Sequence, residues 1–134
     1  MKTINVETHR REEMIDITRQ VQKVVEACGP DHGMVFCFVP HTTAGITINE
    51  NADPDVRRDI IYKLNKEIPQ SDGYHHAEGN SDAHLKASLM GFSEQILFEN
   101  RRLVLGQWQG IYFCEFDGPR RRRLIIEVAG LGKD

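Results

Sequence analysis

Three of the six histidines in this 134-residue chain fall within ten residues, in the segment HHAEGNSDAH at 75–84. Histidine binds metals and carries protons near neutral pH, so this segment is a candidate for a metal site or for acid–base chemistry. His75 and His76 are adjacent, and neighbouring side chains of an extended chain point to opposite sides. We therefore take His76 and His84 as the candidates and His75 as a bystander. Asn80 and Glu78 are candidates to orient the two imidazole rings.

A second polar cluster, HTTAGITINENADPD at 41–55, begins directly after a predicted strand. Turn chemistry and helix capping explain most of its threonine and aspartate residues, but they explain His41 and Glu50 less well. His41, His76 and His84 together would supply three imidazoles, a set that suits Zn²⁺ better than Mg²⁺. Their spacing matches no compact zinc motif. A shared metal or catalytic site and a set of unrelated polar turns therefore both stay open at this point.

The third cluster, GQWQGIYFCEFDGPRRRR at 106–123, ends in four consecutive arginines after a Gly-Pro turn. A run of charge is by default a solvated strand end, but a guanidinium group can hold a phosphate through two hydrogen bonds. Arg120 is the strongest candidate because the turn places it beside Asp117. Strand alternation puts Arg122 on the same side as Arg120 and the other two arginines on the opposite side.

Hydrophobic patterns predict the elements that must position these clusters. We predict strands at residues 2–9, 33–39, 44–50, 94–98, 103–105, 107–116 and 123–129. We predict helices at 14–28, from Pro54 to Pro69, and at 84–90, the last with Ser81 or Asp82 as its cap and Gly91 as its stop. The run 33–39 is continuously apolar, which predicts a strand buried on both faces. Residues 70–82 form a long loop, and loops of this length are often functional.

This order of elements is not the strict alternation of a doubly wound fold. It predicts one domain over residues 1–134, of the α+β class, with two layers of mostly antiparallel sheet and covering helices. A formal net charge of −3 argues against a general nucleic-acid binder. We expect no membrane partner, since no apolar run approaches the ~20 residues that cross a bilayer. The start of the chain lacks the apolar region of a signal peptide, and three widely spaced cysteines suit a reducing cytoplasm.

The three clusters together resemble the YjbQ-like family, also named secondary thiamine-phosphate synthase enzymes. The segments HTTAGITINENADPDVRRDI, HHAEGNSDAHLKASLMG and LGQWQGIYFCEFDGPRRR carry the resemblance, in order and over nearly the whole chain. It implies a β-sandwich of two sheets with helices, in a small cytoplasmic protein that assembles as a homotrimer. It also implies that hydroxymethylpyrimidine diphosphate is joined to a thiazole phosphate with loss of pyrophosphate. In this family that activity is generally regarded as weak or secondary.

The resemblance also implies roles for individual residues. The positions that carry over are His41, Glu50, Asp59, His76, Asn80, His84, Lys86, Trp108, Gln109, Glu115, Asp117 and Arg120. We assign catalysis to His41, Glu50, His76, Asn80, His84 and Lys86, and substrate binding to Trp108, Gln109, Glu115, Asp117 and Arg120. Negative charge grows on the departing pyrophosphate, and Arg120 and Lys86 would stabilise it.

A divalent metal, Zn²⁺ or Mg²⁺, is the cofactor that we consider at His41, His76 and His84. Two other functions fit the same residues. One is a metal-dependent hydrolase of a phosphorylated small molecule, and the other is a non-catalytic trimeric protein that binds a small anionic ligand.

Overall fold

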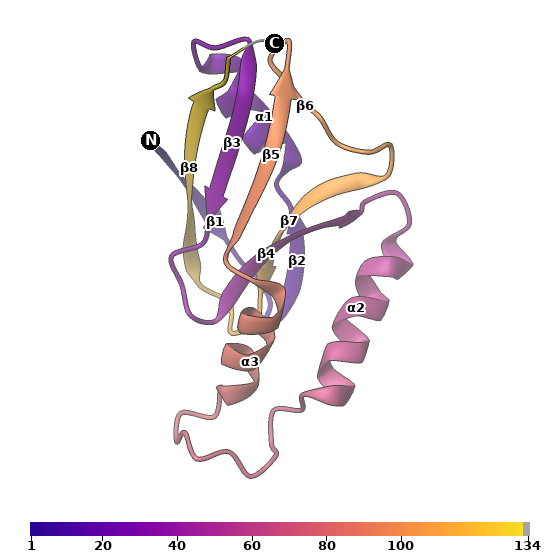
Figure 1. Ribbon diagram of the computed structural model, residues 1–134. Coiled ribbons are helices and arrows are strands. Elements are labelled where there is room, and N and C mark those ends of the chain that lie inside the picture. Colours follow the sequence, from indigo (N-terminus) through magenta and orange to yellow (C-terminus); the bar gives the residue numbers. More distant parts are fainter. Residues whose placement is uncertain (133–134) are drawn as a thin grey trace.

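Two antiparallel sheets and three helices make up the computed structural model, which describes residues 1–132 (Figure 1). The larger sheet has the strand order β1 (Lys2–Glu7), β8 (Arg121–Gly130), β3 (His32–Phe38), β5 (Ser93–Glu99), β6 (Arg102–Leu103). The smaller sheet has the order β2 (Glu13–Asp16), β7 (Gln109–Glu115), β4 (Ala44–Glu50). The helices are α1 (Thr18–Ala27), α2 (Pro54–Glu67) and α3 (Ser81–Met90). The predicted α+β fold of two mostly antiparallel layers is confirmed.

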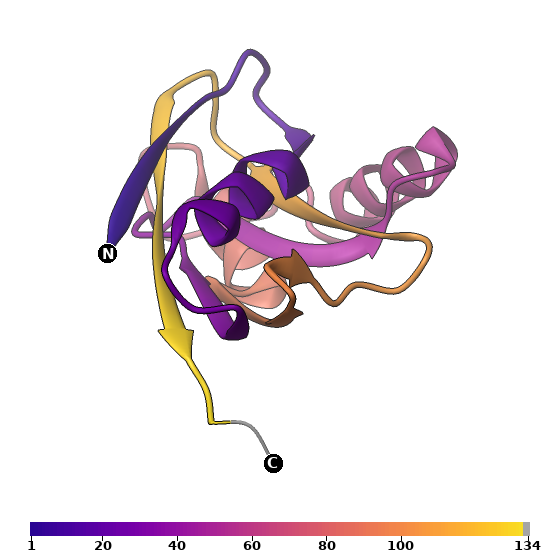
Figure 2. The same cartoon turned by 90° about the horizontal axis from the view of Figure 1, so that it is seen from above.

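The main core lies between the two sheets. Strand alternation turns Val35 and Cys37 of β3 inward, where they meet Ile46 of β4 and Phe113 of β7. Helix α1 lies across one end of the two layers, in contact with strands of both (Figure 2). Full burial of one such side chain contributes roughly 1.5–3 kcal/mol. The packed sheets therefore give the connecting loops a rigid base.

A second, smaller core covers the opposite face of the three-stranded sheet. Tyr112 and Cys114 of β7 point to this face, because residues of a strand alternate between its two sides. Ala83 and Ala87 of α3 pack against them, and both alanines are fully buried. Their small side chains let α3 lie close to the sheet. The helix that carries His84 is thus fixed to the most buried strand of the fold.

The prediction that strand 33–39 is buried on both faces is wrong for the isolated chain. Its outward-facing side chains are Met34, Phe36 and Phe38, and Phe38 is 39% exposed. On the adjacent strand Leu97 is 53% exposed, and it pairs directly with Met34. The reason is that α2 and α3 lie over the smaller sheet, so within residues 1–132 no helix covers this face of the larger one.

The predicted helix 14–28 is in fact a short strand followed by a helix. Met14 belongs to β2, where it pairs with Cys114. Met14 lies outside the helix, but its distance in sequence from the apolar residues of α1 matches a helical period, and the pattern therefore included it in the predicted helix. The carboxylate of Asp16 accepts hydrogen bonds from the backbone N–H and the hydroxyl of Thr18. These bonds satisfy the first free N–H of α1, and the helix begins there.

Helix α2 lies to one side of the sheets in both views (Figures 1 and 2). Its predicted start is confirmed, since the side chain of Asp53 accepts a hydrogen bond from the N–H of Asp55 and Pro54 occupies the first turn. Its predicted apolar stripe is only half-buried, because Ile60, Ile61 and Leu64 meet the edge of the second core. In the part of the chain that the structure describes, no helix has the length and apolar character to cross a membrane.

Candidate functional site

A cavity of about 800 Å³ opens where three connections of the fold meet, and all three predicted histidines line it. The connection from β3 to β4 carries His41. The loop that follows α2 carries His76, and α3, into which it leads, carries His84. The turn between β7 and β8 contributes Arg120. The structure therefore brings residues from all three polar clusters of the sequence to one place.

His76 and His84 form an edge-to-face pair on the wall of this cavity. Their ring centroids are 5.5 Å apart and their planes are inclined at 85°. His84 is held by the helix, whereas His76 lies in the preceding loop, with its Nε2 3.7 Å from a carboxylate oxygen of Glu78. That contact becomes an ion pair when the imidazole is protonated. The two rings are thus adjacent, but His84 is held by a helix and His76 by a loop.

His41 is held by the backbone of β8. Its Nε2 accepts a hydrogen bond of 3.0 Å from the backbone N–H of Arg123. In a neutral imidazole one nitrogen accepts and the other carries the proton, so the proton of His41 belongs on Nδ1. Burial and the charges of Arg122 and Arg123 lower the pKa of His41, which favours this neutral form. His41 is therefore arranged as a hydrogen-bond donor.

Polar contacts join the histidine loop to the β7–β8 turn. The amide nitrogen of Asn80 donates to Oδ2 of Asp117 at 2.9 Å, and the guanidinium of Arg120 donates to the same oxygen at 3.0 Å. The amide oxygen of Asn80 is buried and has no hydrogen-bond partner within residues 1–132. Buried polar atoms are nearly always paired, so this oxygen is an exception among the described residues.

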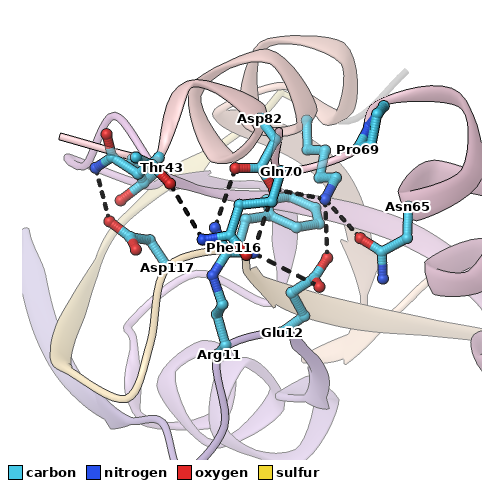
Figure 3. Close-up of polar contacts among 12 residues, drawn as sticks. Arg11, Glu12, Thr43, Asn65, Pro69, Gln70, Asp82, Phe116 and Asp117 are labelled. Atoms are coloured by element: carbon cyan, nitrogen blue, oxygen red, sulfur yellow. Dashed lines mark hydrogen bonds and ion pairs between the residues drawn. The ribbon is translucent and has the colours of Figure 1, made fainter. Parts of the chain in front are cut away.

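Lys86 lies outside the cavity, in a buried ionic network under α3. Its ammonium group is fully buried and donates to Glu12 at 3.1 Å, Asn65 at 2.6 Å and Asp82 at 2.8 Å. Asp82 also accepts two hydrogen bonds from the guanidinium of Arg11, and Figure 3 shows these side chains converging. An ammonium group has three donors, and all three are used here. The structure thus gives Lys86 a place in the attachment of α3 and leaves it no free donor for a substrate.

Neither Ser81 nor Asp82 caps α3 as predicted, because the N-cap position is Asn80 and no side chain caps the helix there. The helix begins at Ser81, and the side chain of Asp82 points away from the free backbone N–H groups into the ionic network. Burial raises the pKa of Asp82, but the hydrogen bonds from Arg11 and Lys86 outweigh burial and the pKa is lowered. Asp82 is therefore a charged partner that fixes the helix, and Gly91, with φ of 96°, ends the helix as expected.

Glu115 also lies behind the cavity. It is fully buried, and its carboxylate accepts hydrogen bonds from Arg122 at 2.9 Å and from the hydroxyl of Thr8 at 2.7 Å. Arg122 lines the cavity and donates in addition to the hydroxyl of Thr43 at 2.8 Å. Glu115, predicted to bind substrate, is thus placed where it holds and neutralises Arg122.

Glu50, Trp108 and Gln109 do not line the cavity in this chain. Glu50 pairs with Gln109 at one end of β4 and β7, whereas the cavity lies at the end where Ala44 pairs with Glu115. Six residues of strand separate the two ends, roughly 20 Å at the rise of an extended chain. Asp59 lies on α2, which contributes no residue to the cavity.

Comparison with known proteins identifies the family. A family model described as UPF0047 protein YjbQ-like matches residues 2–131. The chain belongs to the YjbQ-like UPF0047 family. It is 50% identical to the UPF0047 protein YugU of Bacillus subtilis over 131 residues, which cover 97% of this chain and 99% of that protein. It is 49% identical to a UPF0047 protein of Methanocaldococcus jannaschii over 125 residues, covering 93% and 91% of the two chains.

Solved structures of YjbQ-like proteins have the same fold. A crystal structure of a YjbQ/UPF0047 family protein from Clostridium acetobutylicum has a TM-score of 0.94 at 54% identity, covering 96% of this chain and 100% of that one. A structure from Sulfolobus solfataricus has a TM-score of 0.92 at 35% identity, covering 97% and 96%. The two-sheet architecture implied by the resemblance is thereby confirmed.

Two charged features of this YjbQ-like protein, one in the cavity and one behind it, were not predicted from the sequence. Arg122 was not among the predicted site residues, although strand alternation already placed it on the side of Arg120. The network of Arg11 and Asp82 was also missed, since its partners lie 71 residues apart and nothing local marks them as a pair.

The YjbQ-like chain does not present the three histidines as a ready metal site. Within residues 1–132 no group of three or more His, Cys, Asp or Glu side chains is placed to hold a metal ion. The Nε2 lone pair of His41 is already used by the N–H of Arg123, which leaves His76 and His84 as the adjacent pair. The arrangement thus does not fit a metal ion held by three histidines.

The lowered pKa of His41 in this YjbQ-like protein gives a prediction for NMR. We expect His41 to titrate below 6.5, and Arg123→Gln to raise its pKa part of the way back, since burial is the larger cause. Between the two pKa values the unfolded chain binds more protons than the folded one, so the contribution of His41 to stability falls as the pH drops below 6.5. The measurement is the pH dependence of the imidazole C–H signals. Arg121→Gln is the control, because Arg121 is exposed and does not act on His41; an equal effect of both variants would contradict the assignment.

Proposed function

We propose that this protein is an enzyme that acts on small phosphorylated substrates in the histidine-lined cavity, with the thiamine-phosphate synthase-type activity that the resemblance implies. The observation that carries this proposal is the convergence of His41, His76 and His84 with Arg120 and Arg122 on one cavity of about 800 Å³. Guanidinium groups and imidazole N–H groups are suited to phosphate oxygens.

The reaction joins two substrates and releases pyrophosphate. The lone pair of the thiazole nitrogen forms a bond to the methylene carbon of hydroxymethylpyrimidine diphosphate, and the bond from that carbon to the diphosphate oxygen breaks with its electrons. The thiazole ring becomes positively charged, and the released pyrophosphate carries the negative charge. Atoms and charge balance without a proton transfer. The main task of the protein is therefore to hold the two substrates and to stabilise the leaving group.

The cavity supplies donors for that leaving group. Arg120 is half-exposed and anchored through Asp117, so part of its guanidinium stays available to a phosphate. His41 carries its proton on Nδ1 and adds a neutral donor. Arg122 lies in the wall of the cavity at a fixed, buried position, with its charge paired to Glu115.

An assay with both substrates tests the proposal. We expect pyrophosphate and thiamine phosphate to form with wild-type protein, and Arg120→Ala and His84→Ala each to lower kcat/KM by roughly 10²–10³-fold, the usual effect of losing one transition-state contact. Arg121→Ala is the matched control, since Arg121 is a neighbouring arginine that is 91% exposed and does not line the cavity. Equal losses for Arg120→Ala and Arg121→Ala would contradict the assignment of the site.

Other outcomes would favour the alternative functions. Hydrolysis of a phosphoester that a chelator abolishes would point to a metal-dependent hydrolase, with Zn²⁺ or Mg²⁺ identified by metal analysis of the purified protein. Tight retention of a small anion with no turnover would leave a binding protein. Absence of turnover with any phosphorylated substrate would contradict the proposed enzyme.

We also propose that the chain assembles as a homotrimer in the cytoplasm, as the resemblance implies. The uncovered apolar face of the larger sheet supports self-association, because Leu97 is 53% exposed beside Met34, and Phe38 at the end of β3 is exposed on the same face. Leu97→Glu should shift the mass measured by light scattering from three chains towards one. Lys63→Glu is the control, because Lys63 is an exposed residue of α2, which does not lie on this face. A wild-type protein that remains a single chain at high concentration would contradict the trimer.

A further inference from the structure

A second cavity adjoins the first at the histidine pair. It has a volume of about 460 Å³, and both His76 and His84 belong to its wall as well as to the wall of the larger cavity. Tyr74, His75 and Leu85 line it further. The two cavities therefore adjoin each other at the histidine pair.

The two cavities differ in chemistry. The larger one contains Arg120, Arg122 and Asp117, whereas the smaller one has no Asp, Glu, Lys or Arg among its lining residues. Most of the residues that line the smaller cavity are Tyr74, three histidines and Leu85. Such a wall suits a flat, uncharged ring, and aromatic rings pack against one another in offset or edge-to-face geometry. A diphosphate, in contrast, finds its cationic partners only in the larger cavity.

The loop that forms one wall of the smaller cavity is fixed in place. The hydroxyl of Tyr74 donates a hydrogen bond of 2.7 Å to the carbonyl of Pro69. The amide of Gln70 donates to the carbonyl of Gly79 at 3.2 Å and ties the two ends of the loop together. Gly79 has φ of 77°, a conformation that glycine adopts without strain. The cavity is thus held by its own hydrogen bonds.

From this arrangement we propose that the smaller cavity is a subsite for the thiazole ring of the second substrate, next to the cavity that holds the diphosphate. This inference rests on the proposed function. The nucleophile must reach the methylene carbon from a side other than that of the leaving group, and two adjoining cavities that meet at His76 and His84 provide places for both groups. His75, a bystander by sequence spacing, contacts the ring in this subsite.

The histidines allow a test that does not depend on turnover. In NMR spectra with 4,5-dimethylthiazole as the ring probe, we expect the imidazole signals of His75, His76 and His84 to shift while that of His41 stays. Inorganic pyrophosphate should shift the signal of His41. Histidines 9 and 32 serve as internal controls because they line neither cavity.

A pair of variants on α3 completes the experiment. Leu85→Trp fills the smaller cavity and should abolish the shifts caused by the ring probe, whereas Leu89→Trp, one turn further along and 70% exposed, should keep them. Both variants should keep the response of His41 to pyrophosphate. In the coupled assay Leu85→Trp should raise KM for the thiazole phosphate at least about tenfold and leave KM for the pyrimidine diphosphate unchanged.

The outcomes separate the subsite from the proposed function. A ring probe that shifts only His41, that shifts no histidine because a second copy of the chain covers the cavity, or that still acts in Leu85→Trp would overturn the subsite even if the enzyme turns over. If the probe results hold and the assay shows no synthase activity, the subsite stands and the proposed function falls.

Discussion

Replacing Lys86 with methionine is expected to lower the free energy of unfolding by about 3–5 kcal/mol, the usual effect of removing one partner from a buried ion pair. Lys86 and Asp82 are both 0% exposed, and their charged groups are 2.8 Å apart. Without the ammonium group, Asp82 keeps only the guanidinium of Arg11 as a charged partner. Urea unfolding followed by circular dichroism measures the loss.

The control is an ion pair with the same i, i+4 spacing on the surface of another helix. Lys63 and Glu67 form an i, i+4 pair at 2.8 Å in α2, but both side chains are more than 60% exposed. Lys63→Met should leave the unfolding midpoint unchanged, since exposed pairs are screened by water. If Lys86→Met left stability unchanged and abolished only turnover, Lys86 would return to the catalytic role that the resemblance implies.

Acid should weaken the same network. The pKa of Asp82 is lowered from 3.8 in the folded protein, so its ionised form stabilises the fold above that pH, and the stabilisation is lost as the pH falls through the lowered value. Lys86→Met removes one of the hydrogen bonds that lower this pKa. Acid unfolding of the variant should therefore begin at a higher pH than that of the wild type.

The sequence predicts the fold well because alternation and helical period report which faces are apolar. Strand 44–50, the cap of α2 at Asp53 and the end of α3 at Gly91 all follow from local signals, and the structure confirms them. The sequence predicts less well which part of the molecule covers each face of a sheet. The run at 33–39 indicates apolar surroundings on both sides, but only one of them is supplied by the chain itself.

The histidines of the site were predictable, whereas the roles of its charged residues were not. His41, His76 and His84 stand out by type and do line one cavity. Lys86 and Glu115 stand out equally, yet each is paired inside the protein with a residue that is distant along the chain or on another strand. A lone charge in a sequence gives no sign of whether its partner is a substrate or another side chain. That distinction requires the fold.

Replacing Glu115 with alanine is the second change with a large expected effect, again about 3–5 kcal/mol of unfolding free energy. The variant leaves the guanidinium of Arg122, which is 5% exposed, without its carboxylate partner. The backbone N–H of Asp117 also loses its acceptor, while that of Phe116 keeps the carbonyl of Thr43, and the turn that presents Arg120 is thereby weakened. Stability and substrate binding should therefore fall together.

The matched control is the neighbouring pair of Glu7 and Arg121, which joins β1 to β8 at 3.4 Å with both side chains exposed. Glu7→Ala should leave the unfolding midpoint unchanged. If Glu115→Ala does not fold, Glu115→Gln serves, because it keeps the size of the side chain and removes only its charge. Arg122→Met combined with Glu115→Gln should cost less than the sum of the two single variants, since the pair is coupled. A Glu115→Gln protein with wild-type stability and a raised KM would instead show that Glu115 contacts the substrate directly.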